Sequence, residues 1–134
     1  MFRISTKSQY GLRAMIYLAK CKCKICPLKE VSKKEGISFD YLEKILSKLE
    51  KAGVIKSKKG SQGGYFLSKN PSKIRIGEII RALEKEKGLV MCTVKHGKNC
   101  PLERKCLART FWFKIQKALD SVLNSITLSD LIKK

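Results

Sequence analysis

The segment ISFDYLEKILSKLEKAGVIKSKKGSQGGYFLSK, residues 37–69, decides the fold of this chain. Ser38 is a favourable N-cap residue, and the apolar residues after it have the i, i+3, i+4, i+7 spacing of a helix that buries one face. These residues are Leu42, Ile45, Leu46 and Leu49. Gly53 is placed to end the helix. Two short strand-like runs follow, VIKSK and YFLSK, and the loop KGSQGG between them is rich enough in glycine for a hairpin.

A shorter helix is expected directly before this segment. Pro27 suits the first turn of a helix, and Gly36 is placed to stop it. Two short helices joined by a turn around Gly36 and Ile37 form a helix-turn-helix pattern. Because a basic hairpin follows at once, the sequence predicts a winged helix, in which the hairpin is the wing.

Longer helices are expected on both sides of the winged helix. One begins after Ser5, and another runs from about Ile76 to Lys85. The last has apolar residues spaced by 4, 3, 4, 3 and 4 positions, a heptad pattern about 28 Å long at ~1.5 Å per residue. These are Ala108, Trp112, Ile115, Leu119, Val122 and Ile126. Either this helix packs on its own domain or it joins two copies of the chain. We favour the dimer, because Phe111 and Phe113 broaden the apolar surface.

The charge of the chain limits its partners. Its 134 residues are about the size of one domain and contain 30 Lys and Arg against 11 Asp and Glu, a formal net charge of +19. Such an excess favours a polyanion, either nucleic acid or an anionic membrane surface. Residues 1–91 contain 21 basic and 8 acidic side chains, so the surface for that partner is expected mainly there. No apolar run approaches the ~20 residues of a membrane span and no signal peptide is evident. We therefore expect a cytoplasmic protein with no membrane partner.

An enzyme is the least favoured class. The chain has one histidine, and its sequence has no paired carboxylates and no nucleophile with an evident base. We therefore expect no catalytic residue and no small-molecule substrate.

The face of the 38–51 helix opposite its leucines is suited to DNA. Ser38 and Tyr41, at its N-terminal end, are placed to reach base edges. Lys44 and Lys48, farther along, are placed to bind phosphates. Glu43 has the wrong charge for a polyanion, but it can accept a hydrogen bond from a cytosine amino group, a contact that gives specificity rather than affinity. The alternative is that Glu43 only complements the helix dipole.

The hairpin loop is the second expected DNA contact. Lys58 and Lys59 would bind phosphates, Gln62 would hydrogen-bond within the minor groove, and the backbone around Gly63 would lie along that groove. A run of lysines is usually only a solvated face. Here the run lies beside a helix-turn-helix in a strongly basic chain, which favours contact with double-stranded DNA.

Three of the six cysteines lie between residues 88 and 107, where helical periodicity is lost. Cys92, Cys100 and Cys106 have the spacing C-x7-C-x5-C, and thiolates suit zinc, cuprous copper and iron–sulfur clusters. Zinc knuckles use shorter gaps, so an iron–sulfur cluster with three cysteines and a different fourth ligand is favoured over zinc. His96, inside the loop, is one candidate for that ligand, although a lone loop histidine is more often exposed to solvent.

Together these motifs resemble those of the IscR-like and NsrR-like winged-helix transcription regulators of bacteria. The similar stretches are STKSQYGLRAMIYLA, the segment quoted first, IGEIIRALE, the three spaced cysteines, FW and ITLSDL, which cover nearly the whole chain. The resemblance implies a homodimer crossed at the long helix, a palindromic promoter site, and an iron–sulfur cluster, for which we expect 2Fe–2S rather than 4Fe–4S. It implies that the cluster ligands are Cys92, Cys100 and Cys106. It also implies that the residues of the reading helix are Ser38, Tyr41 and Glu43.

The chain departs from both subgroups at the fourth ligand. IscR-like members have a histidine three residues after the last cysteine, where this chain has Arg109. NsrR-like members have an aspartate just before the tyrosine of the first helix, where this chain has Gln9. The first gap, x7, is also longer than their usual x5. The sequence therefore leaves the fourth ligand and the sensed signal open.

The other three cysteines, Cys21, Cys23 and Cys26, lie outside the motifs of this resemblance, and lysines surround them. One interpretation is that they are reduced thiols in a surface loop. The others are a fourth cluster ligand for the partner subunit, a second metal site, or a sensor of oxidants, for which the neighbouring lysines would make the thiols more reactive.

The predicted architecture is mostly α-helical with a small β-hairpin wing. We expect a winged helix-turn-helix DNA-binding domain over residues 1–75, and a cluster-binding loop with dimerisation helices over residues 76–134. The predicted function is that of a DNA-binding transcription regulator whose promoter affinity is switched by an iron–sulfur cluster on three cysteines. The alternative is a thiol- or zinc-dependent regulator of the same fold without a cluster.

Overall fold

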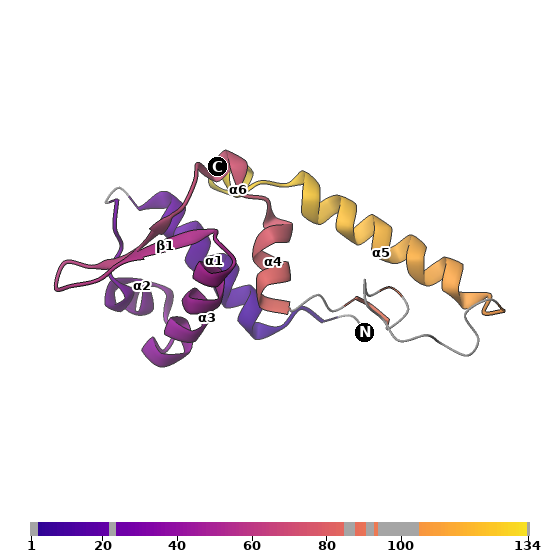
Figure 1. Cartoon of the computed structure of the whole chain (residues 1–134), viewed down its shortest axis with the longest axis horizontal. Helices are drawn as coiled ribbons and strands as arrows, with labels where there is room; N and C mark the ends of the chain where they lie inside the picture. Colours follow the sequence, from indigo (N-terminus) through magenta and orange to yellow (C-terminus); the bar gives the residue numbers. More distant parts are fainter. Residues whose placement is uncertain (1–2, 22–23, 85–87, 91–92, 94–104, 134) are drawn as a thin grey trace.

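The computed structural model describes residues 3–21, 24–84, 88–90, 93 and 105–133 (Figure 1). Within them the chain forms α-helices, a short 3-10 helix and a two-stranded antiparallel sheet. In chain order the elements are α1 (Thr6–Lys20), α2 (Leu28–Glu35), α3 (Phe39–Lys51), β1 (Ile55–Lys58), β2 (Gly64–Leu67), η1 (Pro71–Lys73), α4 (Ile76–Glu84), α5 (Ala108–Ser125) and α6 (Leu128–Ile132). The predicted fold, mostly helical with a hairpin wing after a helix-turn-helix, is confirmed.

The helix ends expected from the sequence are present. The Ser5 side chain accepts a hydrogen bond from the Ser8 N–H at the start of α1. Gly36 ends α2 with φ +66°, a left-handed conformation that glycine adopts without a steric cost. Ser38 caps α3 by accepting from the Tyr41 N–H at 3.4 Å. These caps set the short turn between α2 and α3, and thereby the direction of α3.

The core lies where α3 meets the helices around it. The four apolar residues of α3 expected to face inward are each 1% exposed or less: Leu42, Ile45, Leu46 and Leu49. Met15 of α1, Val31 of α2 and Ile79 of α4 are fully buried against the same cluster. Burying one side chain of this size stabilises a fold by about 1.5–3 kcal/mol. The amphipathic pattern of α3 therefore fixes which of its faces remains in water.

The wing is a regular hairpin with a tight loop. β1 and β2 pair antiparallel, with Ile55 opposite Leu67 and Lys58 opposite Gly64. A Cβ atom at Gly63 would lie 2.1 Å from the Lys58 carbonyl oxygen, so only glycine fits there. Figure 1 shows the hairpin extending away from the helical core.

The end of the chain returns to the winged half. Thr127 and Asp130 form a reciprocal capping box that begins α6, and Leu128 is fully buried in the core. The Ile76 N–H donates to the Ile126 carbonyl oxygen at 2.9 Å. The expectation that Ile126 continues the heptad on the long helix is therefore wrong, because α5 ends at Ser125 and Ile126 is extended. The division of the chain at residue 75 stays a prediction.

α5 differs from the other long helices in its exposure. It packs against α4 and otherwise extends away from the body of the molecule (Figure 1). None of its residues, all of which are described, is fully buried. Its large apolar side chains include Phe111 at 55%, Leu119 at 41% and Val122 at 54% exposure. Among the described helices, none is long and apolar enough to cross a membrane.

The first cysteine group does not lie wholly in a surface loop. Cys26 is only 1% exposed and belongs to the core, while Cys21 is half-buried at the end of α1. The sulfur atoms of these two residues are paired as a disulfide. Cys23 lies outside the described residues. A surface position is therefore the wrong interpretation for Cys26.

Candidate nucleic-acid interface

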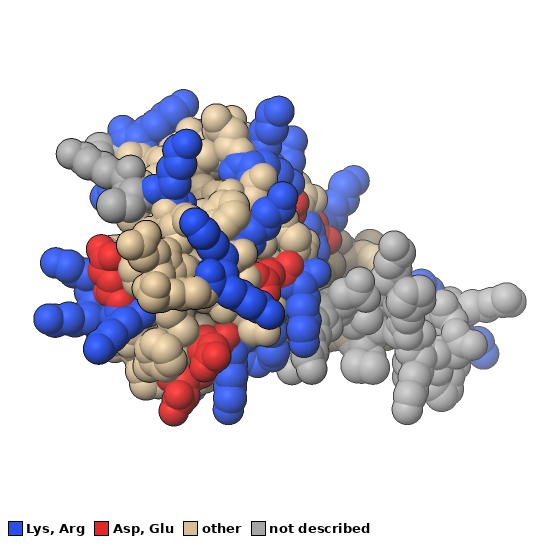
Figure 2. All heavy atoms as spheres, turned by 60° about the vertical axis from the view of Figure 1, so that its left-hand side comes forward, with Lys and Arg blue, Asp and Glu red and all other residues tan. Residues whose placement is uncertain are grey.

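α3 turns a polar face to solvent because its apolar face is used in the core. Glu43 and Lys44 are exposed, and Lys48 is half-buried one turn farther along. Figure 2 shows one face of the molecule, over which Lys and Arg side chains are spread widely with fewer acidic side chains between them. The predicted reading helix is therefore accessible and lies in a basic surface.

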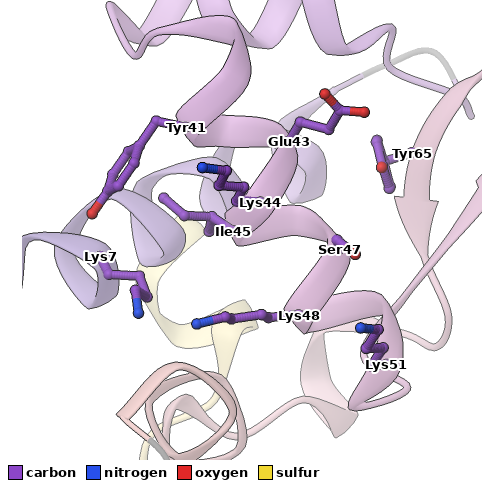
Figure 3. A pocket seen from close by; sticks show the side chains of 9 residues that line it. All are labelled: Lys7, Tyr41, Glu43, Lys44, Ile45, Ser47, Lys48, Lys51 and Tyr65. Atoms are coloured by element: carbon purple, nitrogen blue, oxygen red, sulfur yellow. The ribbon is translucent and has the colours of Figure 1, made fainter.

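A hollow of about 510 Å³ runs beside α3. We call it the α3 hollow, and its lining residues come from α1, α3 and β2: Lys7, Tyr41, Glu43, Lys44, Ile45, Ser47, Lys48, Lys51 and Tyr65. Figure 3 shows Lys7 on one side, the lysines of α3 in the middle and Tyr65 of the wing on the other side. The fold therefore brings four lysines and one carboxylate together on one concave surface.

The two residues at the N-terminal end of α3 are held by local contacts. The Ser38 hydroxyl is used in the cap described above, so its oxygen already accepts one hydrogen bond. The Tyr41 ring lies edge-on to the Tyr10 ring, with 5.9 Å between their centroids. Such aromatic pairs have a preferred geometry, which orients the Tyr41 side chain before any partner arrives.

Tyr65 adds a hydrogen-bond donor to the α3 hollow. Burial, together with the nearby carboxylates of Glu50 and Glu43, raises the pKa of the Tyr65 phenol above its usual value. The phenol therefore remains protonated at neutral pH and can donate to a phosphate or a base edge.

The hairpin loop forms a second, separate surface. Lys58, Lys59 and Gln62 are exposed and Gly63 is half-buried. None of these four residues lines the α3 hollow. Lys58 instead lines a shallower hollow of about 390 Å³ on the wing, with Lys24, Ile25, Ser57 and Phe66. The structure therefore places the predicted DNA-contacting residues in two groups, one along α3 and one on the wing.

The candidate cluster ligands are described only in part. Cys106 is half-buried and lies two residues before α5, where its carbonyl oxygen accepts from the Arg109 N–H at 3.3 Å. Cys92, Cys100 and His96 lie outside the described residues. In the part of the chain that is described, no three His, Cys, Asp or Glu side chains gather as a metal site would require. The donor set itself, three thiols in one segment, has the soft chemistry that an iron–sulfur cluster needs.

The two positions where the resembling subgroups place a fourth ligand have other contacts here. The Arg109 guanidinium lies over the Phe113 ring, 5.2 Å from its centroid. The Gln9 amide donates to the Ile4 carbonyl oxygen at 2.9 Å. Both side chains therefore have local structural contacts within the chain.

The start of the cysteine-containing segment is anchored on α5. The Leu89 N–H donates to the Gln116 side-chain oxygen at 2.9 Å, and the Thr93 hydroxyl lies 3.4 Å from the same oxygen. Gln116 in turn donates to Asp120 at 3.1 Å. One polar side chain of α5 thus holds the residues on both sides of position 92.

Sequence reasoning missed two residues of the α3 hollow. Lys7 lies on α1, more than 30 positions before α3, and Tyr65 lies on β2. Only the packing of α1 and β2 beside α3 brings them there. Neither residue had a local spacing that could have marked it.

Comparisons with known proteins agree with this geometry. The model of the Rrf2 family, described as "Iron-dependent Transcriptional regulator", matches residues 4–134. The HTH-type transcriptional regulator IscR of Klebsiella pneumoniae (strain 342) is 36% identical over 131 residues, which are 97% of this chain and 79% of that protein. Among solved structures, T. potens IscR is similar with a TM-score of 0.78 and 36% identity, over 98% of this chain and 87% of that one. CymR, "the Global Cysteine Regulator of B. subtilis", has a TM-score of 0.76 and 39% identity, over 98% and 97%.

These relatives confirm the resemblance to IscR-like regulators, and they are transcription regulators rather than enzymes. The fold, the exposed reading helix and the comparisons lead to the same conclusion. The chain belongs to the Rrf2 family of DNA-binding transcriptional regulators.

Proposed function

We propose that this regulator is a cytoplasmic homodimer that reads a palindromic promoter site, and that an iron–sulfur cluster on Cys92, Cys100 and Cys106 sets its affinity for that site. The observation that carries the reading of DNA is the α3 hollow, where Glu43 lies among lysines on an exposed helix face. Lysines supply affinity for phosphates, and a single carboxylate supplies discrimination between bases. The wing loop, with Lys58 and Lys59, adds phosphate contacts beside the same site.

The homodimer is supported by the exposed apolar face of α5. Phe111, Leu119 and Val122 lie on a helix that projects from the body and has no fully buried residue of its own. A contiguous apolar surface of this kind marks an interaction site in a soluble protein. A second copy packed two-fold on this face would present two reading helices, which suits an inverted repeat with half-sites about 34 Å apart or a multiple of that distance.

The cluster is supported by the donor chemistry of the loop. Cys92, Cys100 and Cys106 would hold it, and we propose a 2Fe–2S rather than a 4Fe–4S cluster. When bound, it would supply a cross-link between separate points of the loop that depends on iron and on redox state. Cys106, which is half-buried and lies two residues before α5, would be the ligand nearest to that helix.

Side chains of the chain itself connect this loop to the DNA-binding half. At the end of α4, the Glu84 carboxylate accepts from the hydroxyls of Ser5 and Ser8 at the start of α1, the latter at 2.6 Å. In the same last turn of α4, the Arg81 guanidinium donates to the Asn124 side-chain oxygen near the end of α5. A change in the loop between α4 and α5 would therefore act on the angle between α5 and the winged half, and would shift the population of DNA-binding conformations.

A thiol- or zinc-dependent regulator without a cluster is the second candidate. The similarity to CymR, the global cysteine regulator of B. subtilis, and the disulfide of Cys21 and Cys26 both favour it. An anaerobic absorption spectrum separates the two candidates, because a cluster absorbs visible light and a zinc site does not.

Anaerobic reconstitution with iron and sulfide tests the cluster. We expect wild-type protein to gain colour, iron and sulfide, and each of Cys92→Ala, Cys100→Ala and Cys106→Ala to lose them. Cys21→Ser is the matched control, since it removes one thiol outside the loop, and it should retain full iron and sulfide. If the three loop cysteines can be replaced together while iron and sulfide content stays complete, the cluster assignment is wrong.

A further inference from the structure

The turn between α1 and α2 carries a cysteine pair that the cluster proposal does not use. Cys21 follows α1 directly, and its N–H donates to the Tyr17 carbonyl oxygen at 2.9 Å. Cys26 precedes Pro27, the N-cap residue of α2. The two sulfur atoms are paired, and the Cα atoms are 7.0 Å apart. Cys21 is half-buried and Cys26 only 1% exposed, so Cys21 is the more accessible residue of the pair.

The backbone of Cys26 is joined to the wing. Its N–H donates to the Tyr65 carbonyl oxygen, and its own carbonyl oxygen accepts from the Tyr65 N–H, both at 2.9 Å. The contact is close enough that a Cβ atom at Gly64 would lie 2.2 Å from the Cys26 carbonyl oxygen. The turn thus pairs with β2 as a short third strand would, and the position of Cys26 sets the position of β2.

The side chains on either side of this bridge reach the DNA-binding surfaces. Tyr65 lines the α3 hollow beside Glu43 (Figure 3). Lys24 and Ile25, in the turn itself, line the second hollow with Lys58 of the wing. A displacement of the turn would therefore be felt at both surfaces proposed to contact DNA.

We propose that Cys21 and Cys26 are a redox-active pair, oxidised by hydroperoxides, whose disulfide holds the wing in its DNA-binding position. The inference rests on the proposed binding of DNA by α3 and the wing, and it does not require the cluster. The disulfide constrains the turn that carries the bridge to Tyr65. Its reduction frees Cys21 at the end of α1 and removes the covalent constraint on the turn, while the backbone bridge to Tyr65 remains.

The oxidation is balanced with hydrogen peroxide as the oxidant. The Cys21 thiolate attacks one peroxide oxygen, the O–O bond breaks, and the leaving hydroxide takes a proton to become water. The Cys26 thiolate then attacks the sulfur of the resulting sulfenic acid, the S–O bond breaks, and a second water leaves. Two thiols and one peroxide thus give one disulfide and two waters. Cys26 needs no access to solvent, because it attacks a sulfur atom that already lies against it.

The disulfide form should bind DNA more tightly. A constraint that pre-organises a binding element removes part of the ordering cost of association. Coupling between two sites typically changes affinity by about 5–150-fold. Because a single turn acts here on a single wing, we expect an effect in the lower part of that range. We expect the oxidised protein to bind a palindromic promoter fragment about 5–10-fold more tightly than the reduced protein.

The test uses two full-length proteins. The first is the wild type, and the second combines Cys92→Ala, Cys100→Ala and Cys106→Ala. The second protein has no loop thiol that peroxide could oxidise. Each is treated with one equivalent of hydrogen peroxide or fully reduced. The disulfide is mapped by peptide mass spectrometry, and DNA affinity is measured in both states. In the second background, Cys21→Ser should abolish the redox difference, and Cys23→Ser, the neighbouring control, should retain it.

The expected result is a peptide linked between Cys21 and Cys26, together with tighter binding that reverses on reduction. A disulfide that involves Cys23 instead, equal affinity in both states, or tighter binding by the reduced protein overturns the inference. A separate result would instead contradict the proposed DNA-binding function. If neither protein binds DNA in either redox state, and cluster-loaded wild type does not bind either, then the DNA-binding surfaces themselves are misassigned.

Discussion

Removal of two lysines from the wing should weaken DNA binding and reduce the dependence of DNA affinity on salt concentration. Lys58 ends β1, Lys59 begins the hairpin loop, and both are exposed at a distance from the core. Lys58→Ala with Lys59→Ala should therefore leave the fold intact, because neither side chain takes part in core packing. The expected loss is one of phosphate contacts, which is independent of DNA sequence.

The size of the effect follows from counterion release. Each phosphate contact contributes about 0.9 to the slope of log affinity against log salt concentration, so two contacts contribute about 1.8 per protomer. Over a fourfold rise in salt, from about 50 to about 200 mM, this corresponds to a roughly 12-fold change in affinity per protomer. The double variant should bind more weakly at low salt, and its affinity should fall less as salt is added.

A matched control separates local contact from net charge. Lys114 and Lys117 are exposed on α5, far along the chain from the wing, and their replacement by alanine removes the same charge. Fluorescence anisotropy titrations on specific and random duplexes, at four salt concentrations, should show a reduced slope for the wing variant and a nearly unchanged slope for the α5 variant. Equal slopes for the two variants, or a wild-type slope for the wing variant, would refute the assignment of the wing to DNA.

Three further substitutions address specificity, assembly and the base of the wing. Glu43→Ala should reduce the free-energy discrimination between bases at one base pair by about 1–3 kcal/mol and leave binding to random DNA unchanged. A panel of single-base variants of the site measures this discrimination. A uniform loss of affinity on every duplex would contradict the assigned role. Leu119→Glu, at a site 41% exposed on α5, should convert the dimer to a monomer in sedimentation velocity. Lys117→Glu on the same helix is the control and should leave the dimer intact. A dimer that survives Leu119→Glu would mean that the dimer contact lies elsewhere. Gly64→Ala places a Cβ atom 2.2 Å from a backbone oxygen of the α1–α2 turn, so it should lower the free energy of unfolding by about 1–3 kcal/mol in thermal or urea unfolding. Ser61→Ala in the exposed loop is the control and should be neutral. Equal stability of the two variants would show that the wing does not need this close approach.

Local sequence signals were sufficient for the reading helix. The cap at Ser38, the stop at Gly36 and the four buried residues of α3 each depend on contacts within a few positions, and each is present in the structure. The hairpin followed from a change of period and a glycine-rich loop, which are equally local. The fold and the exposed face of α3 could therefore be predicted from the sequence.

Features that depend on distant contacts could not be predicted in the same way. α6 has only five residues, too few for a periodic pattern, and its place in the core depends on a backbone bridge from Thr127 to Arg75. Lys7 and Tyr65 join the α3 hollow through packing alone. Cys26 lies in a lysine-rich stretch typical of a surface loop, yet its pairing with Tyr65 carries it into the core.

Control of promoter affinity through the cysteine loop is tested most directly by one set of binding isotherms. Wild-type protein loaded anaerobically with iron and sulfide, the same protein without metal, and Cys106→Ala given the same two treatments are titrated on one palindromic promoter fragment at one salt concentration. We expect the two wild-type preparations to differ by at least about 5-fold in affinity, and both Cys106→Ala preparations to match the metal-free wild type. Equal affinity of the loaded and metal-free wild type, with loading verified by iron and sulfide content, would contradict a cluster-controlled switch.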